Sequence, residues 1–542
     1  MFGFGKSACG LIKSALKHAR ALAAVVTVTA VAGCSQGNPA SDVDHFGYAV
    51  ASPLLTTNAQ TLVGVSTASE MLAGRLYPPV FVPGPSGQMI PNRDLATVQL
   101  LPGPNIQVVY KINPKAAYSD GEPITCTDFL LAVKAGAHPS LFGSRAPLMQ
   151  QVASVDCVAG AREFTVKFKE NTGARWRQLF GPGTVVPSHA VGRRLGLSEE
   201  QFVALLQSDN RAALMPVAQL WNKGFDLRNF DPELQVSAGP YRIESVGEQG
   251  QVQLVRNENF HGDAANIERV MMWPQNTDLV KVNESNSVEV ADLVGVKDIP
   301  WVNRDDPRNR FTVLHEAGLL TEVLALGNAG VFAEAASRRA FAACVNQEEI
   351  ARISSTESGV EVMPMTSRLT NAGDPINAQL ESVGAAHVGV NLAETEALRG
   401  QTIRIGYSGP NPRKQAMVAA IQASCAPAGI TVVDASSDNA SLGDVSRKEN
   451  YHGGERDYQG SLDAFLYAAD PHQGYGHVDG GLDDVEKLRA TEQQLWDETD
   501  TIPLAAQPRT IVYDSKIANI VPNSSLSGIG WNMERWVEGT TK

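Results

Sequence analysis

The stretch Tyr-Ser-Asp-Gly-Glu-Pro-Ile-Thr at residues 118–125 combines a turn signal with a helix-start signal. Asp120-Gly121 is typical of a tight turn, because glycine readily adopts the positive φ angles that such turns require. Pro123 is favoured at the start of a helix, since its fixed φ suits the first helical position. Just before this stretch, apolar and polar residues alternate over 106–112, the pattern of a half-buried strand. The sequence here predicts strand, turn and helix in succession.

The helix is expected to begin near residue 128 and to run to at least residue 135, with Thr125 or Thr127 as its N-cap. Further along the chain, apolar spacing predicts short strands and helices in alternation. The strands are expected at 163–169, 241–246, 251–256, 402–407, 429–433 and 461–466, and the helices at 338–353 and 414–426. The order strand, helix, strand over 402–433 is a βαβ unit. We therefore expect an α/β fold.

The N-terminus has the pattern of a bacterial lipoprotein signal. Four basic and no acidic residues precede the apolar run at 21–32, which is too short to span a bilayer. The run ends in Val-Ala-Gly-Cys, so that Cys34 stands where lipid is attached. We expect residues 1–33 to be the signal peptide and residues 34–44 a flexible tether. The alternatives are an ordinary secretory signal cut nearby or an uncleaved anchor.

The charge balance excludes one class of partner. Removal of residues 1–33 leaves 41 basic and 58 acidic residues, and the formal net charge moves from −13 to −17. Nucleic acid requires a basic groove that displaces counterions, so we expect no nucleic-acid partner. The acidity indicates solubility of a large body, which the lipoprotein signal would place on the outer face of the cell membrane, held there by the lipid on Cys34. A remaining length of about 510 residues is too great for one hydrophobic core and predicts more than one lobe.

Four cysteines remain besides Cys34 in the processed chain: Cys126, Cys157, Cys344 and Cys425. An even number of cysteines in an oxidising compartment suggests two disulfides. Chain order favours the pairs Cys126–Cys157 and Cys344–Cys425, and four buried free thiols are the alternative. No spacing of cysteine and histidine points to zinc.

Five segments together resemble a known family, the extracytoplasmic solute-binding proteins of peptide-type ABC importers (solute-binding protein family 5). They are residues 109–125, the Val-Val-Pro-Ser-His of 185–189, the Ser-Ala-Gly-Pro-Tyr of 237–241 with 255–257, the helix pattern of 338–350, and the ending from 502 to 531. Each segment is a weak signal alone, but they follow one another in the order of the family. We expect most of them to be scaffold rather than ligand contacts.

The resemblance implies a two-lobed periplasmic-binding-protein-like clamp with an extra subdomain in lobe I. The expected boundaries are 45–80, 178–272 and 495–542 for lobe I, 81–177 for the inserted subdomain and 273–494 for lobe II. The solute would bind between the lobes, which close by a hinge.

The resemblance also implies a ligand site at the Tyr-Ala-Ala-Asp-Pro of residues 467–471. In members of the family that take peptides, an acidic residue at this point holds the α-ammonium of the ligand. That residue here would be Asp470, with Tyr467 in the place of the aromatic side chain. The alternative is that Asp470 only caps a turn before Pro471. Trp221, expected in a polar loop, is a third candidate for ligand contact.

Chemical catalysis and metal binding have little support in the sequence. His472 and His477 lie near Asp479, Asp483 and Asp484, but this spacing matches no metal-ligand motif, and Gly/Asp-rich loops are usually solvated. There is no nucleophile elbow, no His-Glu-x-x-His and no phosphate-binding glycine loop after the signal. We expect no enzyme, no metal and no cofactor.

The function predicted from the sequence is that of a lipid-anchored, monomeric solute-binding protein. It would capture a peptide or another small solute and deliver it to an ABC permease in the membrane. The main alternative is a lipoprotein of the same fold that regulates or scaffolds the synthesis of cell-wall lipoglycan, with a glycolipid as ligand. Two stretches resemble that actinobacterial subgroup: residues 174–180, and residues 495–496 together with 510–512. An adhesive surface lipoprotein is a third possibility.

Overall fold

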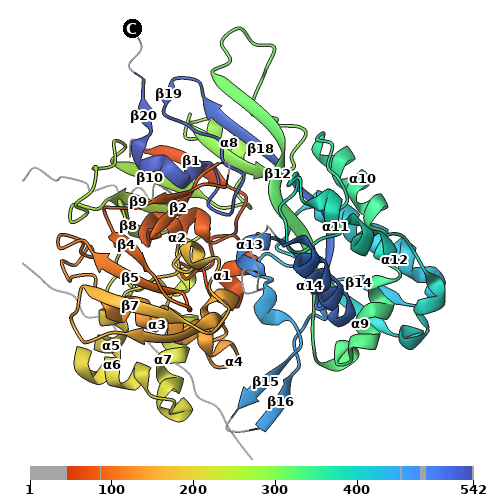
Figure 1. Ribbon diagram of the computed structural model, residues 1–542. Helices are drawn as coiled ribbons and strands as arrows, with labels where there is room; N and C mark the ends of the chain where they lie inside the picture. Colours follow the sequence, from red (N-terminus) through yellow and green to blue (C-terminus); the bar gives the residue numbers. More distant parts are fainter. Residues whose placement is uncertain (1–44, 86, 452–453, 476–483, 540–542) are drawn as a thin grey trace, which may run out of the picture. The chain divides into compact units, whose positions relative to one another are not determined.

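The computed structural model describes residues 45–85, 87–451, 454–475 and 484–539 (Figure 1). Residues from Asp44 onward form one compact unit. The predicted signal peptide, the lipidated Cys34 and nearly all of the tether lie outside the described residues, as do His477, Asp479 and Asp483. No helix in the described part of the chain is both long and apolar enough to cross a membrane.

A ten-stranded mixed sheet runs through the molecule in the order β14-β13-β17-β12-β18-β11-β1-β10-β9-β8. Its strands are β1 (Phe46–Val50), β8 (Tyr241–Val246), β9 (Val252–Arg256), β10 (Arg269–Trp273), β11 (Val290–Val294), β12 (Phe311–Leu326), β13 (Thr402–Gly406), β14 (Thr431–Asp434), β17 (Ala464–Ala469) and β18 (Thr501–Asp514). The strands predicted at 241–246 and 251–256 are confirmed as β8 and β9, which pair antiparallel, and the predicted βαβ unit is confirmed as β13, α12 (Pro412–Cys425) and β14.

Two long strands lie at the middle of this sheet. β12 has 16 residues and β18 has 14, and they pair antiparallel along nearly their whole length (Figure 1). The ladder is interrupted between Ala317 and Thr321, so that residues 318–320 of β12 have no register partner on β18. A break of this kind bends a strand locally and turns side chains away from the regular ladder.

The hydrophobic core is divided. The largest cluster packs side chains of residues 46–272 together with a few from the C-terminal part, including Ile511 and Trp536. A second cluster is built from residues 324–504, with Phe341, Ile405 and Trp496 at its centre. The predicted fold class is confirmed as an α/β clamp of two lobes, each lobe with its own core.

The helices flank this sheet and its lobes. They are α1 (Leu62–Ser66), α2 (Glu70–Leu76), α3 (Cys126–Ala137), α4 (Pro139–Phe142), α5 (Ser188–Arg194), α6 (Glu199–Gln207), α7 (Arg211–Lys223), α8 (Leu279–Asn283), α9 (Ala335–Ala342), α10 (Gln347–Ser358), α11 (Asn377–Gly384), α12, α13 (Pro471–Gly474) and α14 (Val485–Glu498). Three two-stranded sheets pair β2 (Phe81–Pro83) with β3 (Met89–Pro91), β15 (Arg447–Tyr451) with β16 (Gly454–Tyr458), and β19 (Ile517–Ala518) with β20 (Val537–Glu538).

A separate four-stranded sheet forms the extra subdomain of the first lobe. Its order is β4 (Ala96–Leu101), β5 (Gln107–Ile112), β7 (Glu163–Phe168) and β6 (Val152–Asp156). The two strands predicted from alternation are confirmed as β5 and β7, which pair with each other. Tyr110 and Phe164 stack across them with ring centres 5.0 Å apart, so the buried face of the sheet carries aromatic packing.

The stretch at residues 118–125 folds as its residues predict. Gly121 has a φ of +89°, the positive value that the turn requires. Thr125 is the N-cap of α3, and Asp128 completes a capping box by accepting from the Thr125 N–H at 2.9 Å. The other oxygen of Asp128 accepts from the Ser188 N–H at 2.8 Å. Two of the family-like segments therefore hold each other in place, which is a scaffold role.

Two local predictions are wrong. The helix expected over residues 338–353 is two helices, α9 and α10, because Asn346 accepts from the Glu349 N–H and starts a new helix. Trp221 lies in α7 rather than in a polar loop, and its side chain is fully buried.

Disulfides join Cys126 to Cys157 and Cys344 to Cys425. These are the two pairs that chain order favours. The first lies within the subdomain and joins Cys126, at the start of α3, to Cys157, the residue after β6. The second joins Cys344, which follows α9, to Cys425 at the end of α12.

Candidate functional site

A cavity of about 440 Å³ is lined by segments that are far apart in the sequence. One wall consists of β2, β3 and residues 174–182. The opposite wall consists of the interrupted part of β12, Asn371 and the segment from Asp470 to Gln473. A volume of this size lies in the usual range for small-molecule sites.

The end of β17 places Asp470 at the edge of this cavity. Ala469 is the last residue of β17 and pairs with Thr321 of β12, directly after the interruption in the ladder. Asp470 then caps α13, and its Oδ1 accepts from the His472 N–H at 2.8 Å. The capping role that the sequence left open is thus present. The second carboxylate oxygen has no hydrogen-bond partner among the described residues, so Asp470 retains acceptor capacity toward the cavity.

Arg175 is a cation in the lining of the cavity, and its Nη1 lies 3.0 Å from Nδ1 of His472. An arginine has no acceptor, so Nδ1 of His472 accepts and carries no proton. Burial lowers the pKa of His472, an effect that the charge of Asp470 opposes and that of Arg175 reinforces. His472 is therefore neutral near pH 7. Burial also lowers the pKa of Arg175, but an arginine keeps its charge at any physiological pH.

Three further polar atoms of the cavity lining are buried without a hydrogen-bond partner among the described residues. They are Oε1 of Gln178, Oδ1 of Asn371 and Oγ of Ser525. Buried polar atoms are nearly always hydrogen-bonded in folded proteins, so atoms of this kind in a cavity wall indicate the place of a ligand or of ordered water. Two of the three are amide oxygens, and with Asp470 they favour a solute that carries N–H donors.

A buried glutamate of α2 is hydrogen-bonded to the segment that carries Asp470. Nε2 of Gln473, in α13, donates to Oε1 of Glu70, in α2, at 2.9 Å. Burial, helped by the charge of Asp470, raises the pKa of Glu70 to about 7, against the lowering effect of the hydrogen bonds from Gln473 and Ser527 and of the charge of Arg75. Glu70 thus changes its charge close to neutral pH.

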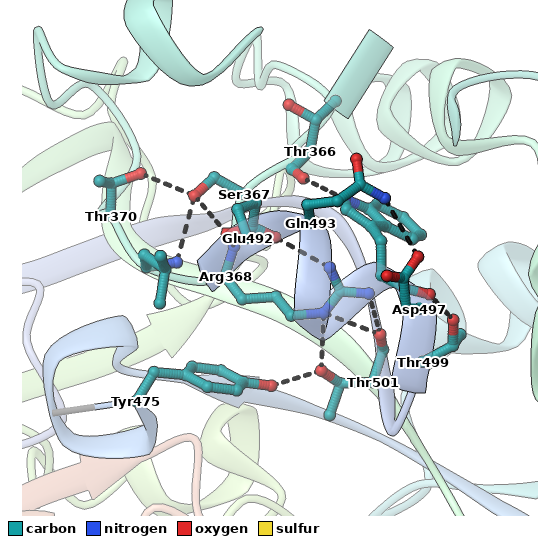
Figure 2. A network of polar contacts seen from close by, with 12 residues as sticks. Thr366, Ser367, Arg368, Thr370, Tyr475, Glu492, Gln493, Asp497, Thr499 and Thr501 are labelled. Carbon is teal, nitrogen blue, oxygen red and sulfur yellow. Dashed lines mark hydrogen bonds and ion pairs between the residues drawn. The ribbon is translucent and has the colours of Figure 1, made fainter. Parts of the chain in front are cut away.

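A buried polar network holds the far end of α13 (Figure 2). The hydroxyl of Tyr475, the residue after the helix, bonds Oγ1 of Thr501. Nε of Arg368 donates to the carbonyl oxygen of the same Thr501 at 3.0 Å, and Nη1 of Arg368 donates to Glu492 at 2.9 Å. The short segment that carries Asp470 is therefore fixed by β17 on one side and by this network on the other.

The other two predicted ligand residues do not line this cavity. Tyr467 lies in β17 with 2% of its surface exposed, and the guanidinium carbon of Arg145 is 6.0 Å from its ring centre. The expectation that Trp221 is an exposed side chain is wrong. It is buried with Leu214, Val217 and Ala218 on one face of α7, and its ring packs edge-on against Phe142. The apolar spacing of these α7 residues was the signal for a core position.

Sequence reasoning missed Arg175, Gln178, Asn371 and Ser525 as lining residues. They come from separate segments of the chain, and none belongs to a motif that predicts a binding role. Only the fold brings them together around Asp470.

Comparison with known proteins agrees with this architecture. Residues 104–475 match the model of the bacterial extracellular solute-binding proteins, family 5. An uncharacterized lipoprotein of Mycobacterium tuberculosis is 32% identical over 553 residues, which covers 95% of this chain and 96% of the relative.

Solved structures of similar fold have diverse ligands. The oligopeptide-binding protein AppA of Bacillus subtilis, in complex with a nonapeptide, has a TM-score of 0.65 at 11% identity and covers 92% of this chain and 99% of its own. The binding protein AgaA of A. tumefaciens, in complex with agropinic acid, has a TM-score of 0.66 at 13% identity with the same coverage. The structures support the fold, and the family match over most of the length confirms the expected resemblance: the chain belongs to family 5 of the bacterial extracellular solute-binding proteins.

Proposed function

We propose that the protein is a lipid-anchored solute receptor of an ABC importer that captures a peptide-like solute between its lobes and delivers it to a membrane permease. The observation that carries this proposal is the cavity at Asp470. There a carboxylate oxygen without a partner and the unpartnered oxygens of Gln178, Asn371 and Ser525 converge from both lobes.

Asp470 is the group that would hold the α-ammonium of the solute. A hydrogen bond between an ammonium and a carboxylate in a partly dry cavity contributes about 1.5–3 kcal/mol. If the solute lacked the ammonium, Asp470 would face only Arg175 and His472. The amide oxygens of Gln178 and Asn371 would then lack N–H partners as well. The cavity therefore favours peptides with a free amino end over blocked ones.

The bonds across the cavity support capture by closure of the lobes. Gln473 bonds Glu70, and His472 bonds Arg175, so the segment next to the ligand site also joins the two lobes. A ligand that contacts both walls would bind the closed arrangement more tightly than the open one and would therefore stabilise it. The closed form would be the one that docks on the permease.

Native mass spectrometry of the full chain, purified from the membranes of a mycobacterial host, tests the proposal. We expect a series of peptide masses on the wild-type protein. Asp470→Asn should lower the affinity for free-amino peptides by roughly 10–100-fold, because the charge-assisted bond is lost. Asp438→Asn changes an exposed aspartate of the second lobe and serves as the control that should bind as the wild type does.

Unchanged peptide affinity in Asp470→Asn would remove this residue from the site. A glycolipid mass in place of peptides would contradict the transport of peptides and would favour the role in lipoglycan synthesis.

A further inference from the structure

Glu70, in the first turn of α2, is a buried carboxylate without a cation. It is 5% exposed, and among the described residues no nitrogen of a lysine, arginine or histidine lies within 4.0 Å of its oxygens. The buried carboxylates of Glu322 and Glu492, in contrast, are each paired with an arginine. Arg75 of the same helix donates instead to the carbonyl oxygen of Gly530. A buried carboxyl group without a cation binds its proton more tightly than an exposed one does.

The hydrogen bonds of Glu70 fit either protonation state. Its Oε1 accepts from Nε2 of Gln473 at 2.9 Å, and its Oε2 accepts from the hydroxyl of Ser527 at 3.3 Å. An amide N–H can only donate, whereas a hydroxyl can donate or accept. When Oε2 carries a proton, its O–H can therefore donate to Ser527, while the bond from Gln473 stays as it is. Glu70 can gain or lose a proton without the loss of a hydrogen bond.

The helix α13 brings a second carboxylate close to Glu70. Gln473, which donates to Glu70, follows the cap residue Asp470 by three positions, and its N–H donates to the carbonyl oxygen of Asp470 at 3.1 Å. Two carboxylates that are held near one another each disfavour the ionised form of the other. Burial, helped by the charge of Asp470, raises the pKa of Glu70 to about 7. The charge of Glu70 therefore depends on what neutralises Asp470.

Other ionisable groups act on Glu70 directly or through its two charged neighbours, Asp470 and Arg75, and the loop 523–528 that carries Ser527 contributes none. They are His472 of α13, Arg175 of the cavity lining, Tyr48 of β1, Tyr241 of β8 and Glu534 of the 3-10 helix Ile529–Arg535. Arginines keep their charge at any physiological pH. Burial raises the pKa of both tyrosines and lowers the pKa of His472. Among the groups of this set with a shifted pKa, Glu70 is therefore the one that titrates at pH 7.

We propose that Glu70 is a positioning residue of the solute site and that its proton controls the affinity for the ammonium group at Asp470. The charged form of Glu70 accepts from Gln473 and adds a second negative charge near the ammonium. The protonated form keeps the bond from Gln473 but adds no charge. When the ammonium binds, the O–H bond of the carboxyl group breaks, its electron pair stays on Oε2, and the proton passes to the solvent. The inference rests on the proposed function, since it concerns the residue that would hold the ammonium.

The coupling has a definite sign. An ammonium at Asp470 favours the ionised form of Glu70 and lowers the pKa of Glu70 from its value of about 7. The solute therefore binds more tightly to the deprotonated protein, and its affinity rises with pH. If the ammonium weakens proton binding by about tenfold, the lower end of the effect of one nearby opposite charge, about 0.4 proton is released per solute at pH 7 and the affinity falls about fivefold from pH 8 to pH 6.

Isothermal titration calorimetry of the full chain with tri-L-alanine tests this coupling. Titrations at pH 7 in phosphate and in Tris count the protons released, because the two buffers take up a proton with different heats. Glu70→Gln keeps an acceptor for Gln473 and an N–H for Ser527, and thus imitates the protonated form. The amino group of the peptide exchanges the same protons with either protein. We expect the wild type to release roughly 0.4 proton more than the variant.

The affinity at several pH values separates this role from a merely structural one. From pH 8 to pH 6 the affinity of the wild type should fall about fivefold further than that of Glu70→Gln. A residue that only held α13 in place would change the affinity equally at every pH. The matched control is Glu348→Gln. Glu348 also stands in the first turn of a helix, α10, but is exposed there, and this variant should behave as the wild type does.

Equal proton release by the wild type and Glu70→Gln, with peptide binding retained, would overturn the inference and leave the proposed function intact. Loss of proton release in Glu348→Gln as well would also overturn it. Glu70→Leu provides a second uncharged variant if Glu70→Gln does not fold. If the wild type binds no peptide with a free amino group, the peptide form of the proposed function fails, and the inference fails with it.

Discussion

Three arginines of this protein are buried together with a carboxylate partner. The pairs are Arg368 with Glu492, Arg413 with Glu322, and Arg509 with Asp292, and each side chain is at most 3% exposed. Desolvation of two charges costs several kcal/mol, which their attraction offsets only when both groups are fully hydrogen-bonded. Arg368 meets this condition. It bonds Glu492 and Thr501 (Figure 2). Its guanidinium carbon also lies 4.0 Å from the ring centre of Trp496.

Removal of one member of this network should be costly. We expect Arg368→Met to lower the free energy of unfolding by about 3–5 kcal/mol, because Glu492 would be left as an unpaired buried charge. Urea unfolding followed by circular dichroism measures this loss. Arg352→Met, which breaks the exposed pair with Glu349, should cost less than about 1 kcal/mol. A similar loss in the two variants would contradict the role of burial.

At the scale of elements, α13 and α2 are joined through a group that titrates. Gln473 of α13 donates to Glu70 of α2, whose pKa burial raises from 4.5 to about 7. A raised carboxyl pKa means that the folded state binds the proton more tightly than the unfolded state does. The protein therefore loses stability as the pH rises from about 4.5 to about 7, and above that range the whole penalty is present.

Glu70→Gln should remove this pH dependence, since the amide oxygen still accepts from Gln473 but carries no charge. We expect the variant and the wild type to be equally stable near pH 4, and the variant to be more stable at pH 8 by up to about 3 kcal/mol. Unfolding curves at the two pH values give the difference. Glu248→Gln, in the exposed loop between β8 and β9, is the control. A gain of the same size at both pH values would show that Glu70 does not titrate as described.

Elements with a clear local signal could be predicted from the sequence, and elements whose ends depend on a single cap could not. Alternation identified β5 and β7, and the turn at Gly121 with the cap at Thr125 identified the start of α3. The apolar pattern over residues 338–353 continues through Ala343 and Cys344 at helical spacing. Only the hydrogen bond that the Glu349 N–H donates to Oδ1 of Asn346 shows that α9 and α10 are separate helices. Propensity contains little information on such a break.

At the scale of the whole molecule, the candidate site could be predicted only in part. Asp470 was identified because it lies in a short motif next to a strand. The unpartnered oxygens of Gln178, Asn371 and Ser525 are recognisable as part of a site only by their burial and lack of partners among the described residues. These are properties of the packed structure, and no pattern along the chain encodes them.

The attachment of the whole molecule to the membrane is expected to depend on Cys34. Cys34→Ser should move the protein from the membrane fraction to the culture medium, because serine has no thiol to which the expected lipid could be attached. Fractionation and immunoblotting measure the distribution. Cys9→Ser changes the other cysteine of the N-terminal 44 residues and should have no effect on it. Full retention of Cys34→Ser on membranes would mean that the uncleaved N-terminal segment is the anchor.

The position of β18 in the sheet has a consequence for the order in which the protein is made. β18 is the last of the ten sheet strands along the chain, yet it lies between β12 and β11 and is the strand that joins the two halves of the sheet. A growing chain can assemble four strands on one side and five on the other, but each group then has an open edge until residues 501–514 emerge from the ribosome. Because pairings over such sequence distances form slowly, the sheet of the nascent polypeptide stays divided until β18 has been made and has paired with β11 and β12. That state is the one in which a chain can still be threaded through a narrow pore.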